Sequence, residues 1–131
     1  MGSGVVRVYK TKAFRRFQRK ERIEDTALGE AVRRAERGLI DADLGAGLIK
    51  QRVARKGQGR RSGFRTIIAY RTEVRSVFMY GFAKSGQANL STADERDLAD
   101  FGRMLLSLKA NGIETLIIDN ELEEIEFDDE A

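Results

Sequence analysis

The stretch Leu48–Lys84, LIKQRVARKGQGRRSGFRTIIAYRTEVRSVFMYGFAK, predicts three consecutive β-strands. Its apolar segments are rich in β-branched and aromatic residues and cover Leu48–Arg55, Phe64–Arg71 and Arg75–Lys84. A glycine-rich basic link, KGQGRRSG, joins the first two segments, and the short link TE joins the last two as in a hairpin. The stretch is therefore predicted to form an antiparallel meander.

The residues before this meander predict one further strand and two helices. Val5–Thr11 alternates apolar and polar residues, as a half-buried strand does, and the Thr11 hydroxyl can then cap a helix. Two amphipathic helices are expected between this strand and Gly38, the second with Asp25 as its cap. Residues 39–47, LIDADLGAG, are expected to form a loop or a short turn.

The residues after the meander predict a third helix and an acidic end of ambiguous structure. The helix is expected from Ala93 to about Lys109, with a cap at Ser91 and a stop at Asn111-Gly112. Residues 113–131, IETLIIDNELEEIEFDDEA, fit either a helical turn with a short strand or a mobile acidic tail. The order β-α-α-β-β-β-α predicts an α+β domain, in which helices pack on an antiparallel sheet.

Composition excludes several classes of site. The chain has 131 residues, enough for one compact domain, and contains neither cysteine nor histidine. Disulfides, thiolate catalysis and zinc–thiolate sites are thereby excluded. No apolar run approaches the ~18 residues of a membrane span, and the start lacks the apolar region of a signal peptide. The cytoplasm is the expected location, and Met1–Gly4 resemble a cloning remnant.

Charge is distributed unevenly along the chain. Residues 1–84 carry 21 Lys/Arg and 8 Asp/Glu, a net +13, whereas residues 85–131 carry 3 and 13, a net −10, and together these give the overall +3. The interval Lys50–Arg65 alone holds seven cations and no carboxylate. Their mutual repulsion, screened over ~8–10 Å at cellular salt, is offset by a polyanion or an acidic partner. Nucleic acid is the obvious candidate, because Arg forks match phosphate oxygens and glycines let a backbone approach closely.

The cations of this interval are expected to converge and to suffice for RNA chemistry. Residues two apart on a strand face the same way, so Lys50 and Arg52 share a face, and Arg65 on the next strand can meet them. RNA supplies its own nucleophile, the 2′-OH, and neighbouring positive charges lower the pKa of a lysine below its ordinary ~10.4. A Lys/Arg cluster can therefore cleave RNA without histidine or metal. The cations that crowd the link between the strands are Arg55, Lys56, Arg60 and Arg61.

The segment LIKQRVARKGQGRRSGFRTIIAYR, followed by VFMYGFAKS, resembles the toxins of the RelE/ParE superfamily, specifically its RelE/HigB-like branch. The resemblance covers residues 5–110, taken as the toxin domain, and leaves residues 111–131 as an acidic C-terminal extension. It implies a ribosome-dependent mRNA endonuclease that is held inactive by a cognate antitoxin. No metal, no small-molecule cofactor and no membrane partner are expected.

The resemblance assigns roles residue by residue. Lys50 and Arg52 match the paired basic residues of the family's catalytic strand, where Lys50 would serve as general base or assist it. Arg65 matches the arginine that would stabilise the pentacoordinate phosphate, and Lys84 matches the basic residue that would act as the acid. The residues expected to bind RNA are Arg55, Lys56, Arg60, Arg61 and Tyr80.

The sequence departs from the family pattern after Lys84. The family typically places an acidic residue there and, further on, a tyrosine that stacks on the mRNA, whereas this chain has Gly86 and Ser91. The stacking role would then pass to Tyr80 or Phe82, although alternation and apolar context favour core positions for both.

Two rival functions remain open at this point. A ParE-like protein would inhibit DNA gyrase by protein–protein contact, although the dense Lys/Arg set on the second and third strands argues against it. A non-catalytic relative would use the same cations only to bind phosphates, with steep salt dependence and no cleavage products.

Several charged groups have simpler explanations. Asp41 and Asp43 are too few to predict a metal site, and Arg71 and Arg75 flank a turn and are expected to be solvated. The acidic end either folds back over the basic face or is a solvated terminus, and the second is favoured. Solubility is the favoured role of the first helix's polar face, with an rRNA footprint as the alternative; its cations are Arg15, Arg16, Arg19 and Lys20.

Overall fold

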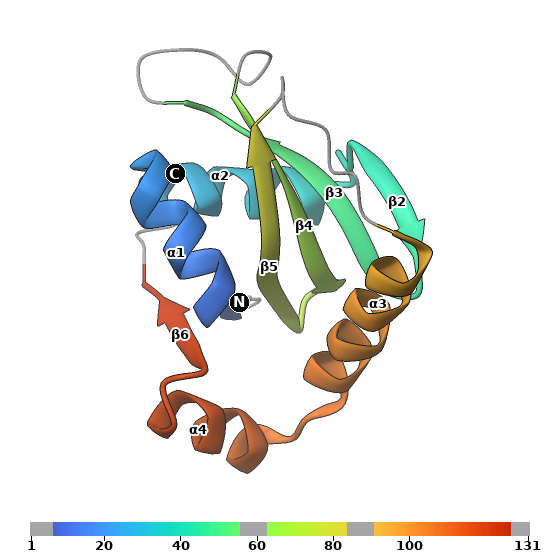
Figure 1. Ribbon diagram of the computed structural model, residues 1–131. Helices are drawn as coiled ribbons and strands as arrows, with labels where there is room; N and C mark the ends of the chain where they lie inside the picture. Colours follow the sequence, from blue (N-terminus) through green and yellow to red (C-terminus); the bar gives the residue numbers. More distant parts are fainter. Residues whose placement is uncertain (1–6, 56–62, 84–90, 127–131) are drawn as a thin grey trace.

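The computed structural model describes residues 7–55, 63–83 and 91–126, and within them it forms an α+β fold, as predicted (Figure 1). The elements in chain order are β1 (Arg7–Thr11), α1 (Lys12–Glu21), α2 (Asp25–Glu36), β2 (Ala42–Gly45), β3 (Leu48–Val53), β4 (Phe64–Arg71), β5 (Arg75–Ala83), α3 (Thr92–Ser107), α4 (Ala110–Ile118) and β6 (Leu122–Ile125). Among these described residues, no helix is long and apolar enough to cross a membrane.

One mixed sheet contains all six described strands, in the order β2-β3-β4-β5-β1-β6. The meander β3-β4-β5 is antiparallel, as its sequence predicts. The neighbouring pair β1 and β5 is parallel, so the sheet is mixed rather than wholly antiparallel. The two helices α1 and α2 lie between β1 and β2 in the chain, so that β1 is beside β5 whereas β2 is at the far edge of the sheet.

Helices cover both faces of the sheet, and each face has its own apolar cluster. On one face α1 and α2 pack through residues such as Phe14 and Leu28 against Ile68 and other strand residues. On the other face α3 and α4 contribute Leu105 and Ile113. Because alternate residues of a strand point to opposite faces, each central strand supplies both clusters.

Helix caps explain where the helices begin. Thr11 caps α1, because its hydroxyl accepts a hydrogen bond from the Phe14 backbone N–H, as predicted. Ser91 caps α3 in the same way, accepting from the Asp94 N–H. The expectation that Asp25 caps the second helix is wrong: the cap position is Glu24, and the Asp25 carboxylate accepts instead from Lys10 and Gln18.

Residues 91–126 contain more regular secondary structure than their composition suggests. The third helix ends at Ser107, and the Asn111-Gly112 pair, expected to end it, lies inside α4. Leu108 and Lys109 have extended backbone conformations that separate the two helices. Beyond α4, β6 pairs antiparallel with β1, so up to Ile125 the helix-and-strand alternative is confirmed.

The residues expected to form a loop before β3 contain the short strand β2. It pairs antiparallel with β3, and the register shifts between Asp43 and Gly45. Gly45 and Gly47 both have positive φ, which permits the tight turn into β3. This edge strand places Asp41 and its neighbours beside the basic residues of β3.

Candidate nucleic-acid interface

Lys50, Arg52 and Arg65 lie on one face of the sheet, as predicted. Arg52 on β3 is directly opposite Arg65 on β4, and Lys50 is opposite Ile67. Directly opposite residues of an antiparallel pair share a face, and Ile67 belongs to the cluster beneath α3 and α4. Along β3 this face changes from buried Leu48 through half-buried Lys50 to exposed Arg52. The basic residues therefore occupy the part of the face that the helices leave open.

Two aromatic side chains of β5 border this open area. Phe82 is opposite Arg65, and Tyr80 is opposite Ile67. Both rings are half-buried, and their centroids are 6.1 Å apart in a tilted arrangement. Tyr80 also packs against the cluster beneath α3, so one part of its ring contacts the core and another part is exposed.

A β-bulge places Tyr80 on this face. The register shifts so that Ile68 is opposite Phe78 whereas Ile67 is opposite Tyr80, which leaves Met79 as the extra residue. With strict alternation Tyr80 would share the face of Phe78, which packs against α1. Sequence periodicity alone cannot locate a bulge. The glycine that follows, Gly81, is the local feature of the sequence that indicates one, because a glycine inside a strand often marks a bulge.

Arg65 is a half-buried cation without a charge partner in the described part of the chain. Its Nη1 atom is buried and has no hydrogen-bond partner there. Arg52 lies across β3 and Phe82 across β5, so neither neighbour supplies an anion. A guanidinium desolvated in this way is stabilised when a negatively charged ligand approaches.

Arg52, in contrast, is held by Asp41. One carboxylate oxygen accepts from the Arg52 backbone N–H at 2.7 Å and from Arg34 Nη1 at 3.3 Å, and the other accepts from Arg52 Nη2 at 3.3 Å. Arg34 is only 5% exposed in its side chain and also donates to the Arg52 carbonyl oxygen and to Glu30. This network fixes the end of β3.

The pKa of Asp41 is lowered by this environment. Burial alone raises it, but hydrogen bonds from the Arg52 backbone and from the Arg34 and Arg52 guanidinium groups more than compensate. Asp41 is thus an ion-pair partner of Arg52 on β3 and of Arg34 on α2. No group of three His, Cys, Asp or Glu side chains that could hold a metal occurs within the ranges that the structure describes.

The other predicted RNA-binding residues are only partly described. Arg55 is half-buried, and its guanidinium carbon lies 4.4 Å from the ring centroid of buried Phe64. This cation–π contact holds Arg55 beside the start of β4. The predicted site residues outside the described ranges are Lys56, Arg60, Arg61 and Lys84.

The Ser91 hydroxyl is used in a helix cap. Its Oγ accepts from the Asp94 N–H at 3.0 Å at the start of α3, which explains why a small hydroxyl residue occupies this position. A serine has no ring for base stacking. Within the described face, only Tyr80 and Phe82 of β5 flank Arg65 with aromatic rings.

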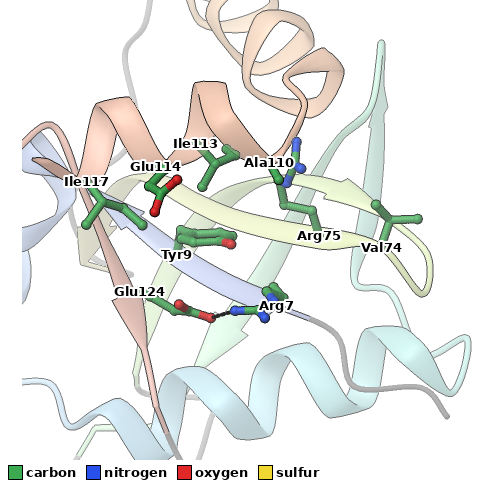
Figure 2. Close-up of a pocket in the computed structure, with 9 residues that line it drawn as sticks. All are labelled: Arg7, Tyr9, Val74, Arg75, Ala110, Ile113, Glu114, Ile117 and Glu124. Carbon is green, nitrogen blue, oxygen red and sulfur yellow. Dashed lines mark hydrogen bonds and ion pairs between the residues drawn. The ribbon is translucent and has the colours of Figure 1, made fainter. Parts of the chain in front are cut away.

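A separate groove of about 470 Å³ lies beneath α4, at the end of the sheet where β5 begins (Figure 2). Buried Tyr9 forms its floor, burial raises the Tyr9 pKa, and an Arg7–Glu124 ion pair crosses one side. Arg75, expected to be solvated, lines the groove and donates to the Leu105 carbonyl oxygen at 2.7 Å. None of the predicted site residues lines it, so it is distinct from the basic face.

The carboxylates of β6 bind cations at the opposite edge of the sheet from β3. Glu124 pairs with Arg7, and Glu123 lies near Arg15 and Lys10. β6 and β3 are separated by β1, β5 and β4. Within the described residues, therefore, the acidic segment neutralises β1 and α1 rather than the candidate site, and residues 127–131 lie outside the described part.

Comparison with protein-family models matches residues 6–125 to one family, RelE, described as the RelE toxin of the RelE/RelB toxin–antitoxin system. The match includes α4 and β6 as well as the basic face. A comparison with curated proteins found no match.

Proposed function

Because this chain belongs to the RelE family of toxins from toxin–antitoxin systems, we propose that it is a ribosome-dependent mRNA endonuclease. The family implies a cognate antitoxin as its protein partner. The proposed reaction is attack of an RNA 2′-OH on the adjacent phosphate, with release of the 5′-oxygen of the next nucleotide. The observation that carries this proposal is the buried Nη1 of Arg65, which has no hydrogen-bond partner among the described residues and lies on the face that Arg65 shares with Lys50.

The three described basic residues have different environments, which suits different roles. Arg65 has a donor without a partner among the described residues, and this donor would bind a phosphate oxygen and stabilise the charge that develops at phosphorus. Lys50 is two residues from Arg52 on the same face, where it would serve as the general base towards the 2′-OH or assist it. Arg52 is anchored by Asp41 and contributes a fixed positive charge. Lys84 would protonate the leaving oxygen.

Tyr80 and Phe82 supply surfaces on which RNA bases can stack. Base–aromatic stacking contributes about 1–3 kcal/mol per base and does not depend on sequence. Both rings flank the strand position of Arg65, so a stacked nucleotide would bring its phosphate towards the guanidinium. This arrangement would position the 2′-OH and the phosphate together, and such positioning is a large part of RNA cleavage.

A second candidate, RNA binding without cleavage, is supported by the position of Ser91. This residue stands where the family typically has a stacking tyrosine, and its hydroxyl is used in the α3 cap. A protein of this kind would retain salt-dependent binding through the basic face but would leave the RNA intact.

Primer extension on mRNA from a reconstituted translation reaction tests the proposal. We expect cuts in ribosome-bound mRNA with the wild-type protein, no cuts when ribosomes are omitted, and no cuts with Arg65→Ala. Arg71→Ala is the matched control, because Arg71 is an exposed arginine at the other end of the same strand. Intact mRNA with retained ribosome binding would instead support the non-catalytic candidate.

A further inference from the structure

A second cationic pocket lies on the face of the sheet opposite the candidate cleavage site. Its volume is about 280 Å³, and it is lined by residues of α1, of the link that follows α1, of β1 and of the edge strand β6. Lys10 on β1 is in register with Phe78 of β5 on one side and with Glu123 of β6 on the other. The polar groups that line the pocket are Lys10, Arg15, Gln18, Arg19, Arg22 and Glu123.

Lys10 is a buried ammonium group in the wall of this pocket. The residue is 6% exposed, and its Nζ donates to Gln18 Oε1 at 2.7 Å and to Asp25 Oδ1 at 3.1 Å. Gln18 is itself fixed, because its amide nitrogen donates to the Ile23 carbonyl oxygen and to Asp25. An ammonium group has three donors, and the Glu123 carboxylate lies 3.9 Å from this one, beyond hydrogen-bond distance.

Each of the three arginines in the pocket has N–H donors without an acceptor among the described residues. Arg15 binds Asn120 and Glu123 through its terminal nitrogens, but its buried Nε has no partner among the described residues. Neither the Arg19 nor the Arg22 side chain has a partner in the part of the chain that the structure describes. Arg22 has φ 56° at the C-cap of α1, the left-handed conformation that ends this helix.

The charges of this pocket do not balance. Four cations (Lys10, Arg15, Arg19 and Arg22) stand against the two carboxylates that contact Lys10 (Asp25 and Glu123), which leaves an excess of two positive charges. We propose that this pocket binds a phosphate group of an RNA backbone, with Glu123 as an internal competitor for the same cations. The proposal rests on the proposed function in one respect, since a ribosome-directed protein meets RNA on more than one side.

The lining favours a phosphate over an acidic protein segment. Ile23 is the one apolar side chain in this lining, whereas protein partners usually insert aromatic or aliphatic anchors. Arginine forks, in contrast, match the oxygens of a phosphate group. An acidic peptide is therefore the alternative that the test must exclude.

Because of Glu123, the proposal predicts that one substitution in the pocket tightens RNA binding rather than weakening it. Its carboxylate lies 3.3 Å from Arg15 Nη1, so a phosphate that enters the pocket meets its negative charge. Glu123→Gln keeps the size of the side chain and removes that charge, which should tighten RNA binding about fourfold. Glu124→Gln is the matched control: it is the next residue on β6, and its partner is Arg7, at the groove of Figure 2.

The experiment is a titration of a fluorescein-labelled RNA duplex, followed by anisotropy at several salt concentrations. All variants carry Arg65→Ala, so that cleavage does not interfere. Glu123→Gln should lower the Kd about fourfold relative to Glu124→Gln. Arg19→Ala with Arg22→Asn should weaken binding and reduce the slope of log K against log salt by about 1.5. Asparagine is chosen at Arg22 because it tolerates positive φ.

Each contrary outcome is distinct. Equal affinities of the Glu123→Gln and Glu124→Gln proteins, with native circular dichroism, would overturn the proposal. So would an unchanged salt slope in the double arginine variant. Binding of poly-glutamate that depends on Arg19 and Arg22, while RNA binding does not, would assign the pocket to an acidic protein. Saturation by inorganic phosphate without effect on RNA binding would reduce it to a free-phosphate site. None of these readouts requires cleavage, so failure of the proposed function is detected separately.

Discussion

Replacing Asp41 by asparagine should destabilise the fold, because this carboxylate holds the end of β3. Its two oxygens accept three hydrogen bonds, two from Arg52 and one from Arg34. The amide group of the variant would lack the charge and would turn an N–H group towards these donors. Hydrogen bonds to charged groups contribute about 1.5–3 kcal/mol each, but Arg52 is 44% exposed and Arg34 keeps Glu30 and the Arg52 carbonyl as acceptors. We therefore expect a loss of about 2 kcal/mol.

Urea unfolding at several pH values measures this effect. At neutral pH the Asp41→Asn protein should unfold about 7 °C lower in a parallel thermal scan. The folded pKa of Asp41 lies below its ordinary 3.8, so its stabilisation is complete above that value and is lost as pH falls through the folded pKa. The difference in free energy of unfolding between wild type and variant should thus be constant above about pH 5 and should shrink below about pH 4.

Asp43→Asn is the control for this experiment. Asp43 lies two residues further along the chain than Asp41, in β2, and its carboxylate accepts from the exposed Gly45 N–H. We expect its substitution to cost less than about 0.5 kcal/mol at any pH. Equal effects of the two substitutions, or a gap for Asp41→Asn that persists undiminished at pH 3, would refute the assignment of Asp41 as the anchor of β3.

Three further predictions test the packing and the local electrostatics. Gly81→Ala should cost about 1–3 kcal/mol, because an added Cβ would lie 2.4 Å from Phe17 Cε2; Phe17→Leu should recover part of this loss in a double-mutant cycle by chemical denaturation. Ser91→Ala should cost about 1 kcal/mol through loss of the α3 cap, whereas Ser91→Asp should be nearly neutral; equal thermal midpoints for the two would contradict the cap. Burial and a hydrogen bond to Glu36 raise the pKa of Tyr70 to about 12, so its stabilisation is present below pH 10 and is lost as pH rises towards 12. In ultraviolet titrations, wild type and Tyr70→Phe should differ by one phenol that titrates near pH 12, and a missing phenol that titrates near pH 10 would reject the contact.

Local sequence patterns predicted the meander and the shared face of Lys50 and Arg52. Period-two alternation located β3, β4 and β5, and the same alternation placed Lys50 and Arg52 on one face. The cap at Thr11 was predictable from its hydroxyl and from the amphipathic pattern that follows. These features depend on neighbours within a few residues along the chain, which is the range over which sequence patterns are informative.

Features that depend on distant parts of the chain were not predictable. The parallel pairing of β1 with β5 joins segments more than 60 residues apart (Arg7 with Arg75). The bulge that brings Tyr80 to the face of Arg65 depends on the register with β4. The role of Asp41 became visible only when β2 was found beside β3. In each case tertiary pairing, rather than local periodicity, decides which side chains meet.

The most direct test of the proposed cleavage site separates ribosome binding from the cleavage rate. Single-turnover cleavage of ribosome-bound mRNA and ribosome affinity are measured together for wild type, Arg65→Lys, Arg65→Ala and Arg71→Ala. Loss of one electrostatic donor to a transition state typically slows a reaction about 10²–10³-fold. We predict that Arg65→Ala loses this much rate with less than threefold change in affinity (about 0.6 kcal/mol), that Arg65→Lys recovers part of the rate, and that Arg71→Ala resembles wild type. Equal rates for Arg65→Ala and wild type, or a loss explained wholly by weaker binding, would contradict the account.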